Sequence, residues 1–143
     1  MDSCFTFQTD FKVRVDDINY GGHMGNERFL LLFHDARLRF LELLGFSEKD
    51  IGGGIGLIMK EAHVNYKAEV FMGEELRVGV MITDLQQVQF NMQFQVERDS
   101  NHKTTATGYT RMVAFDIENR KVCKIPDEFK TRLALYLNSF KTA

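Results

Sequence analysis

A cluster of polar side chains surrounds a glycine-rich bend early in the chain, in the stretch VRVDDINYGGHMGNERF (residues 13–29). Its chemically versatile members are Asp17, Asn19, His23 and Asn26. A carboxylate can act as a general base or a nucleophile, and an imidazole or an amide can hold a carbonyl oxygen or a water molecule. The bend is therefore either a turn that needs polar residues for its backbone or a reactive site built on a helix N-terminus.

The residues of this bend have distinct potential roles. Asp17 and Asn19 would share a face if a strand continued through them, because side chains repeat every second residue. Asp17 is then the nearest available base, and a turn or cap acceptor is an equally good interpretation of it. His23 opens the following helix and can donate or accept a hydrogen bond. Backbone N–H groups near Gly25 and Asn26 lack partners within the helix, so they can hold a negatively charged oxygen. The Asn26 side chain is equally suited to capping the helix.

Two further polar residues, Glu61 and His63, lie on the polar face of a later strand pattern. We favour a solvated strand face, because such faces are common in antiparallel sheets. The alternative is that Glu61 or His63 belongs to a binding or catalytic site. The four histidines show neither HExxH nor Cys-pair spacing, and no Ser or Cys lies in a nucleophile motif. Neither a metal site nor such a nucleophile is therefore predicted.

The elements on either side of the bend follow from hydrophobic periodicity. Apolar residues occupy alternate positions from Phe5 to Val15, which predicts a strand that runs on to the glycine pair after Tyr20. From about His23 to Leu44 the apolar residues recur at helical spacing. The apolar stripe is widened nearly all round by Leu31, Leu32 and Leu43, so a sheet is expected to enclose this helix. The helix is predicted to end at a C-cap formed by Gly45 and Phe46.

The second half of the chain reads as consecutive strands. The segment IGGGIG (51–56) lacks a Gly-Lys-Ser/Thr and precedes a strand, so we predict a flexible connection rather than a phosphate loop. Strand patterns follow in LIMKEAHVNYKAEV, ELRVGVMIT, QVQFNMQFQVE and KTTATGYTRMVAFDI. In the first of these, Ile58, Ala62 and Val64 are predicted to face one way, and Glu61 and His63 the other. A C-terminal helix is predicted after Pro126, with Asp127 near its cap.

This order of elements predicts an α+β fold in which an antiparallel sheet wraps around one long buried helix. The length of 143 residues suits a single domain (1–143), and no repeat or linker interrupts it. The formal net charge of -2 without a basic run argues against nucleic acid and membrane surfaces as partners. The start of the chain is not a signal-peptide pattern, no continuous membrane span is present, and two cysteines are too few for a disulfide framework, so a cytoplasmic protein is expected.

The sequence resembles the hotdog-fold acyl-CoA thioesterases of the 4-hydroxybenzoyl-CoA thioesterase type. In that family a strand ends in Asp-x-Asp, a Gly-His or Gly-hydrophobic pair opens the helix, and an acidic-Ala-Arg segment follows. The corresponding residues of this chain are Asp17-Ile-Asn19, Gly22-His23, Asn26 and Asp35-Ala36-Arg37. The later pieces Val64-Asn-Tyr66, Gly73-Glu-Glu-Leu76 and Ile125-Pro126-Asp-Glu also fit, so the resemblance spans nearly the whole chain.

The resemblance implies a hotdog domain that pairs into a homodimer and often assembles further, for example into a homotetramer. Active sites would lie at the dimer interface, each at the N-terminus of the long helix. The substrate would be an acyl thioester carried on coenzyme A or on an acyl carrier protein. Hydrolysis would need no metal and no cofactor other than the coenzyme A of the substrate itself.

One departure falls on the second acid of Asp-x-Asp, which in the family attacks the thioester or activates water. This chain has Asn19 there, and an amide cannot accept a proton at neutral pH. The first hypothesis is a thioesterase in which Asn19 and His23 position the substrate or water and Asp17, or Glu61 of a second copy, is the base. The second is a binding protein that holds acyl-CoA or another ligand without hydrolysing it. A dehydratase or hydratase ranks last, because the Asp/Glu–His motif it requires is not seen.

Overall fold

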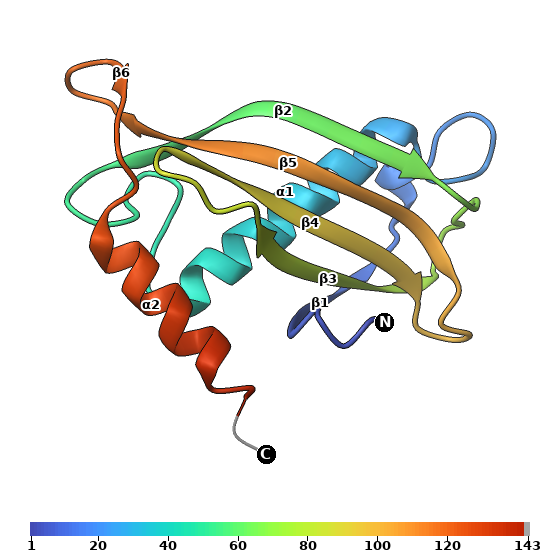
Figure 1. Cartoon of the computed structure of the whole chain (residues 1–143). Helices are drawn as coiled ribbons and strands as arrows, with labels where there is room; N and C mark the ends of the chain where they lie inside the picture. Colours follow the sequence, from blue (N-terminus) through green and yellow to red (C-terminus); the bar gives the residue numbers. More distant parts are fainter. Residues whose placement is uncertain (142–143) are drawn as a thin grey trace.

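The computed structural model describes residues 1–141, in which an antiparallel sheet curves around a long helix (Figure 1). The elements are, in chain order, β1 (Phe7–Lys12), the 3-10 turn η1 (Val15–Asp17), α1 (Asn26–Leu43), β2 (Gly56–Tyr66), β3 (Glu75–Thr83), β4 (Gln89–Arg98), β5 (Thr104–Asp116), β6 (Lys121–Val122) and α2 (Asp127–Asn138). The strands are ordered β1-β3-β4-β5-β2, and β6 pairs with β5. The predicted α+β fold is therefore confirmed.

Helix α1 lies against the concave face of the sheet (Figure 1) and contributes the aromatic side chains Phe29, Phe33 and Phe40 to the core. The ring of Phe33 stacks on Phe94 of β4 at 4.4 Å, and Phe40 packs against Phe7 of β1 at 5.3 Å. One side of the helix is accessible to solvent, as the 52% exposure of Leu31 shows. The expectation of enclosure nearly all round was therefore too broad.

The C-terminus of α1 has the predicted cap. Gly45 has a φ of +88°, a conformation that side chains with a Cβ rarely adopt. Its N–H donates to the carbonyl of Glu42, and the N–H of Phe46 donates to the carbonyl of Leu41. These two bonds satisfy carbonyl groups that the end of a helix leaves without intrahelical partners.

The predicted continuation of the first strand to Tyr20 is wrong. Strand β1 ends at Lys12, and the chain then turns through η1 before α1 starts at Asn26, three residues after the predicted start at His23. The physical cause lies in Asp17, whose Oδ2 accepts a hydrogen bond from the N–H of Arg14 at 2.8 Å and so closes the turn. A short acidic side chain that bonds to nearby backbone competes in this way with strand pairing.

The alternation predicted for β2 fails at a β-bulge between Met59 and Glu61. Met59 pairs with the buried Met112 and Ala62 pairs with the buried Thr110, so both face α1. Ile58 faces the opposite side of the sheet and was assigned to the wrong face. A bulge inserts one residue, here Lys60, and therefore reverses the phase of the alternation.

The IGGGIG segment is a tight connection into β2. Gly52, Gly53 and Gly54 all have positive φ, and the Asp50 carboxylate accepts the N–H groups of Gly52 and Gly54 at 2.8 and 3.0 Å. Because an internal carboxylate occupies these donors, they do not form a cradle for phosphate. The prediction of a connection is confirmed, although Asp50 holds the segment in a defined turn.

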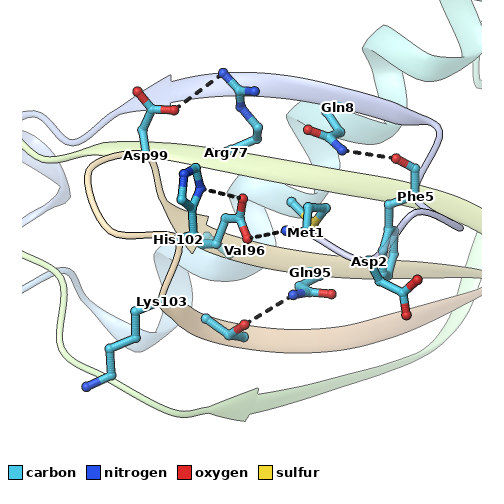
Figure 2. Close-up of polar contacts among 12 residues, drawn as sticks. Met1, Asp2, Phe5, Gln8, Arg77, Gln95, Val96, Asp99, His102 and Lys103 are labelled. Carbon is cyan, nitrogen blue, oxygen red and sulfur yellow. Dashed lines mark hydrogen bonds and ion pairs between the residues drawn. The ribbon is translucent and has the colours of Figure 1, made fainter.

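The face of the sheet away from α1 carries a network of polar contacts, part of which is drawn in Figure 2. Gln95 donates to Thr104 at 3.1 Å, and Arg77 pairs with Asp99 at 3.4 Å; Figure 2 marks the second contact with a dashed line. Beside them Glu97 is buried and pairs with the α-amino group of Met1 at 2.9 Å. The polar side chains of β4 alternate with its buried residues, and each of them bonds to a neighbouring side chain: Gln89, Asn91, Gln93 and Gln95.

Candidate active site

The bend after η1 brings Asn19 and His23 together. The Asn19 Oδ1 accepts a hydrogen bond from the N–H of Gly21 at 2.9 Å, and the Asn19 N–H donates to the His23 carbonyl at 2.9 Å. Asn19 Oδ1 and His23 Nε2 lie 3.2 and 3.3 Å from the position that a Cβ would take at Gly21. The two side chains therefore occupy the same side of the bend, over a residue that has no side chain.

The His23 imidazole is oriented by its own backbone. Its Nδ1 lies 3.2 Å from the carbonyl oxygen of Met24, and because a carbonyl can only accept, Nδ1 is the nitrogen that donates there. In the neutral ring this leaves Nε2 as an acceptor. His23 can therefore hold a water molecule or a polar group of a ligand through Nε2.

The Asp17 carboxylate does not join Asn19 and His23. It is engaged at the N–H of Arg14, while the Asp17 carbonyl accepts the N–H of Gly25 at 3.0 Å. Because the strand stops before Asp17, the expected shared face with Asn19 does not exist. The observed contacts of Asp17 are those of a turn acceptor that also fixes the approach to α1.

The N-terminus of α1 is held in place by its neighbours and presents free donors. The N–H of Met24 donates to the carbonyl of Val70 at 2.6 Å, and Gly25 takes the N-cap position. Within residues 1–141 the N–H groups of Asn26 and Glu27 have no acceptor. Such donors, aligned with the helix dipole, are suited to hold an oxygen that becomes negatively charged.

A cavity of about 260 Å³ opens at this helix N-terminus. Its walls combine the start of α1 with the segment after β2, and they include His23, Asn26, Phe29, Tyr66 and Val70. Phe29 and Tyr66 meet edge to face at 5.4 Å, so the inner wall is aromatic. The cavity therefore offers an apolar wall beside polar groups, which is the usual make-up of a small-molecule site.

Tyr66 is a site residue that the sequence analysis did not identify. Its hydroxyl donates to the carbonyl of Asn26 at 2.9 Å, which ties the end of β2 to the first residue of α1. Burial and the nearby Glu27 carboxylate raise the pKa of the Tyr66 phenol, so it stays a donor. Its position in an alternating strand indicated an inward side chain, and nothing in the sequence indicated that its hydroxyl would reach the helix.

Glu61 and His63 lie on the opposite face of the sheet from the cavity. The Glu61 carboxylate accepts from the Tyr109 hydroxyl at 2.6 Å and from Arg111 at 3.0 Å, and these two contacts lower the pKa of Glu61. The His63 ring stacks on Tyr109 at 5.6 Å. Within one copy, neither residue joins Asn19, His23 and Asn26.

Within residues 1–141, no three His, Cys, Asp or Glu side chains converge in a way that could hold a metal ion. No helix in the same range has the length and apolar character needed to cross a membrane.

An antiparallel sheet wrapped around one long helix, with a cavity at the helix N-terminus, defines the hotdog class of fold. The chain belongs to the thioesterase-like superfamily, whose family model matches residues 13–133. It resembles the solved structure of Slr0204, a 1,4-dihydroxy-2-naphthoyl-CoA thioesterase from Synechocystis, with a TM-score of 0.82 and 22% sequence identity, over 90% of this chain and 95% of that one. The predicted fold and the resemblance to hotdog thioesterases are both confirmed.

Two curated relatives of the chain are named for the hydrolysis of CoA thioesters. A 1,4-dihydroxy-2-naphthoyl-CoA hydrolase of Synechococcus sp. is 28% identical over 122 residues, which cover 80% of each chain. The L-carnitine dehydrogenase/betainyl-CoA thioesterase of Ruegeria pomeroyi is 25% identical over 122 residues, which cover 85% of this chain. This chain spans only 25% of the length of that second relative.

Proposed function

We propose that this protein hydrolyses acyl-CoA thioesters at the N-terminus of α1. The observation that carries the proposal is the cavity lined by His23, Asn26 and Tyr66 at the start of α1, where the N–H groups of Asn26 and Glu27 have no acceptor within residues 1–141. Membership of the thioesterase-like superfamily and the CoA thioesterase names of its relatives support the same chemistry. An acyl group on a carrier protein is the second substrate form that this site would accept.

The proposed chemistry uses the chain's own groups and no metal. The thioester carbonyl would lie against the N–H groups of Asn26 and Glu27, which stabilise the oxygen as it becomes negative. Gly25 belongs to this site as the N-cap residue that directly precedes the N–H groups of Asn26 and Glu27. Asn19 and His23, which occupy one side of the bend, would position the substrate or the attacking water. The apolar wall formed by Phe29 would contact the acyl group.

We also propose that two copies pair through β2, forming a homodimer that can assemble further. Strand β2 is an edge of the sheet, and of Ile58 to Tyr66 only Val64 is not exposed. Beside it lies a cavity of about 370 Å³ whose walls include Leu30, Leu31 and Met59. An exposed edge strand with adjoining apolar side chains favours pairing with another chain.

The function is tested by following thiol release from a panel of short, long and aromatic acyl-CoAs, with one acyl carrier protein thioester as a separate arm. We expect turnover of at least one class, and a fall of about 100-fold for His23→Ala. His102→Ala is the matched control, because His102 lies in the exposed turn between β4 and β5.

A specific negative result would favour the binding-protein alternative that Asn19 suggests. If the wild type binds acyl-CoA but releases no thiol from any member of the panel, hydrolysis is not its function. Activity that appears only in Asn19→Asp would then identify the missing carboxylate as the reason.

A further inference from the structure

Hydrolysis at the α1 site requires a base, and the two residues at the family's acidic positions do not supply one. Asn19 is an amide, and its Oδ1 is already bonded to the N–H of Gly21. The Asp17 carboxylate is bonded to the N–H of Arg14. Glu61 lies on the far face of the sheet with Tyr109 and Arg111. None of these three side chains is therefore free to activate water, which leaves His23 and the other carboxylates near the helix N-terminus as candidate bases.

Glu27 places a carboxylate directly beside the helix N-terminus. Its two oxygens lie 2.6 and 2.8 Å from the position that a Cβ would take at Gly25. Gly25 has φ -64° and ψ 146°, which any residue can adopt, so its backbone does not require glycine. The space above Gly25 is instead occupied by the Glu27 carboxylate, which folds back over the residue that precedes the free N–H groups.

Two cavities meet the first turn of α1 at neighbouring residues, Asn26 and Glu27. Glu27 lines the apolar cavity between α1 and β2, and it follows Asn26, which lines the cavity at the helix N-terminus. The charge of Glu27 also helps to raise the pKa of the Tyr66 phenol, which lies in the cavity at the helix N-terminus. The reacting carbonyl of a thioester joins an apolar acyl chain to a polar carrier. We therefore place this carbonyl at the first turn of α1, which lines both cavities.

We propose that Glu27 is the general base of the hydrolysis, an assignment that rests on the proposed function. The Glu27 carboxylate takes a proton from a water molecule whose oxygen bonds to the thioester carbon. The oxygen of the resulting tetrahedral intermediate is held by the N–H groups of Asn26 and Glu27. When the C–S bond breaks, the proton on Glu27 passes to the sulfur, so the products are a free thiol and an acid that loses its own proton to solvent.

The competing explanation for Glu27 is a structural one. Acidic side chains are common in the first turn of a helix because they interact favourably with its dipole. That role would affect the stability of α1 but would not affect the chemical step. Glu69 lines the cavity at the helix N-terminus and is a second carboxylate that could act there.

The test compares Glu27→Gln, Glu69→Gln and Asp17→Asn with the wild type, using the acyl-CoA that the panel identifies. Glu42→Gln, on the exposed last turn of α1, is the matched control. We expect Glu27→Gln to lower kcat by about 100- to 10,000-fold. Binding of a non-hydrolysable thioether analogue should change by less than about threefold, since only an interaction made in the transition state is removed.

A double-substitution cycle that combines Gly25→Ala with Glu27→Gln tests whether kcat depends on the position of the Glu27 carboxylate. A methyl group at residue 25 would displace the Glu27 side chain, so Gly25→Ala should lower kcat in the wild type. It should have little further effect in Glu27→Gln, because the two changes remove the same interaction. Glu27→Asp, which keeps a carboxylate on a shorter side chain, should recover part of the lost kcat.

The possible failures are distinguishable. Turnover that survives in Glu27→Gln and is lost in Glu69→Gln or Asp17→Asn overturns the role of Glu27 alone. A Glu27→Gln protein that is less stable to heat but equally active shows the helix-dipole role and also overturns it. Absence of turnover in the wild type itself overturns the proposed function, and the role of Glu27 with it.

Discussion

Arg37 is the one arginine that α1 turns toward the core, and its burial demands a partner. Arg37 is 5% exposed, and its Nε donates to the Glu48 carboxylate at 2.7 Å. One of its terminal nitrogens donates to the Thr110 hydroxyl at 3.4 Å. The His34 Nε2 approaches the same Glu48 oxygen at 3.4 Å. A charge in this position is tolerated only while its acceptor remains.

Removing that acceptor should be costly for stability. Glu48→Ala leaves the Arg37 guanidinium buried without its carboxylate, and we expect the free energy of unfolding to fall by about 3 kcal/mol. Asp35→Ala is the control, because it breaks the exposed pair with Arg39 on the same helix and should cost less than about 1 kcal/mol. Urea unfolding of both variants measures the difference, and equal losses would contradict this account of Arg37.

At the scale of elements, the end of α1 depends on a single glycine. Gly45→Ala forces a residue with a Cβ to keep a φ of +88°, and the new Cβ would meet the guanidinium of Arg132. We expect a loss of about 1–2 kcal/mol in the free energy of unfolding. Gly53→Ala is an informative comparison, because Gly53 also has positive φ but a Cβ there would meet nothing. A larger loss at Gly45 than at Gly53, measured by thermal or urea unfolding, isolates the contribution of the contact.

The sequence predicted the elements whose signals are long and periodic. Helix α1, its cap at Gly45 and the strands from β3 to β5 all follow from apolar spacing that extends over many residues. The errors occurred where one residue changes the pattern. Asp17 diverts the chain into η1 by bonding to Arg14, and Lys60 adds one position to β2. Neither event leaves a periodic signal, so neither could be predicted from spacing.

The sequence predicted only the part of the candidate site that is local in the chain. The bend with Asn19 and His23 and the free N–H groups at Asn26 are local features, and the sequence indicated all three. Tyr66 reaches Asn26 from another element, across 40 positions of the chain. The placement of the Glu27 carboxylate above Gly25 depends on a side-chain conformation, which a residue type does not specify.

At the scale of the whole molecule, pairing through β2 is the prediction that concerns assembly. We expect the protein to sediment as a dimer and Leu31→Arg to weaken the dimer by at least about 100-fold, because a charge replaces an apolar side chain beside the edge. Leu135→Arg is the matched control, since Leu135 is 65% exposed on α2 and away from that edge. Sedimentation of the two variants over a range of concentrations decides the matter, and a dimer unaffected by Leu31→Arg would contradict pairing at this surface.

The bulge in β2 also has a consequence for solubility. An exposed edge strand of 11 residues is a template onto which unrelated extended segments can add, which is how many proteins begin to aggregate. At Lys60 the two halves of β2, 56–59 and 61–66, fall out of phase with each other. A regular foreign strand can match only one half in a single register, and it meets a charged lysine where the halves join. The bulge at Lys60 therefore restricts the segments that can pair with this edge of the sheet.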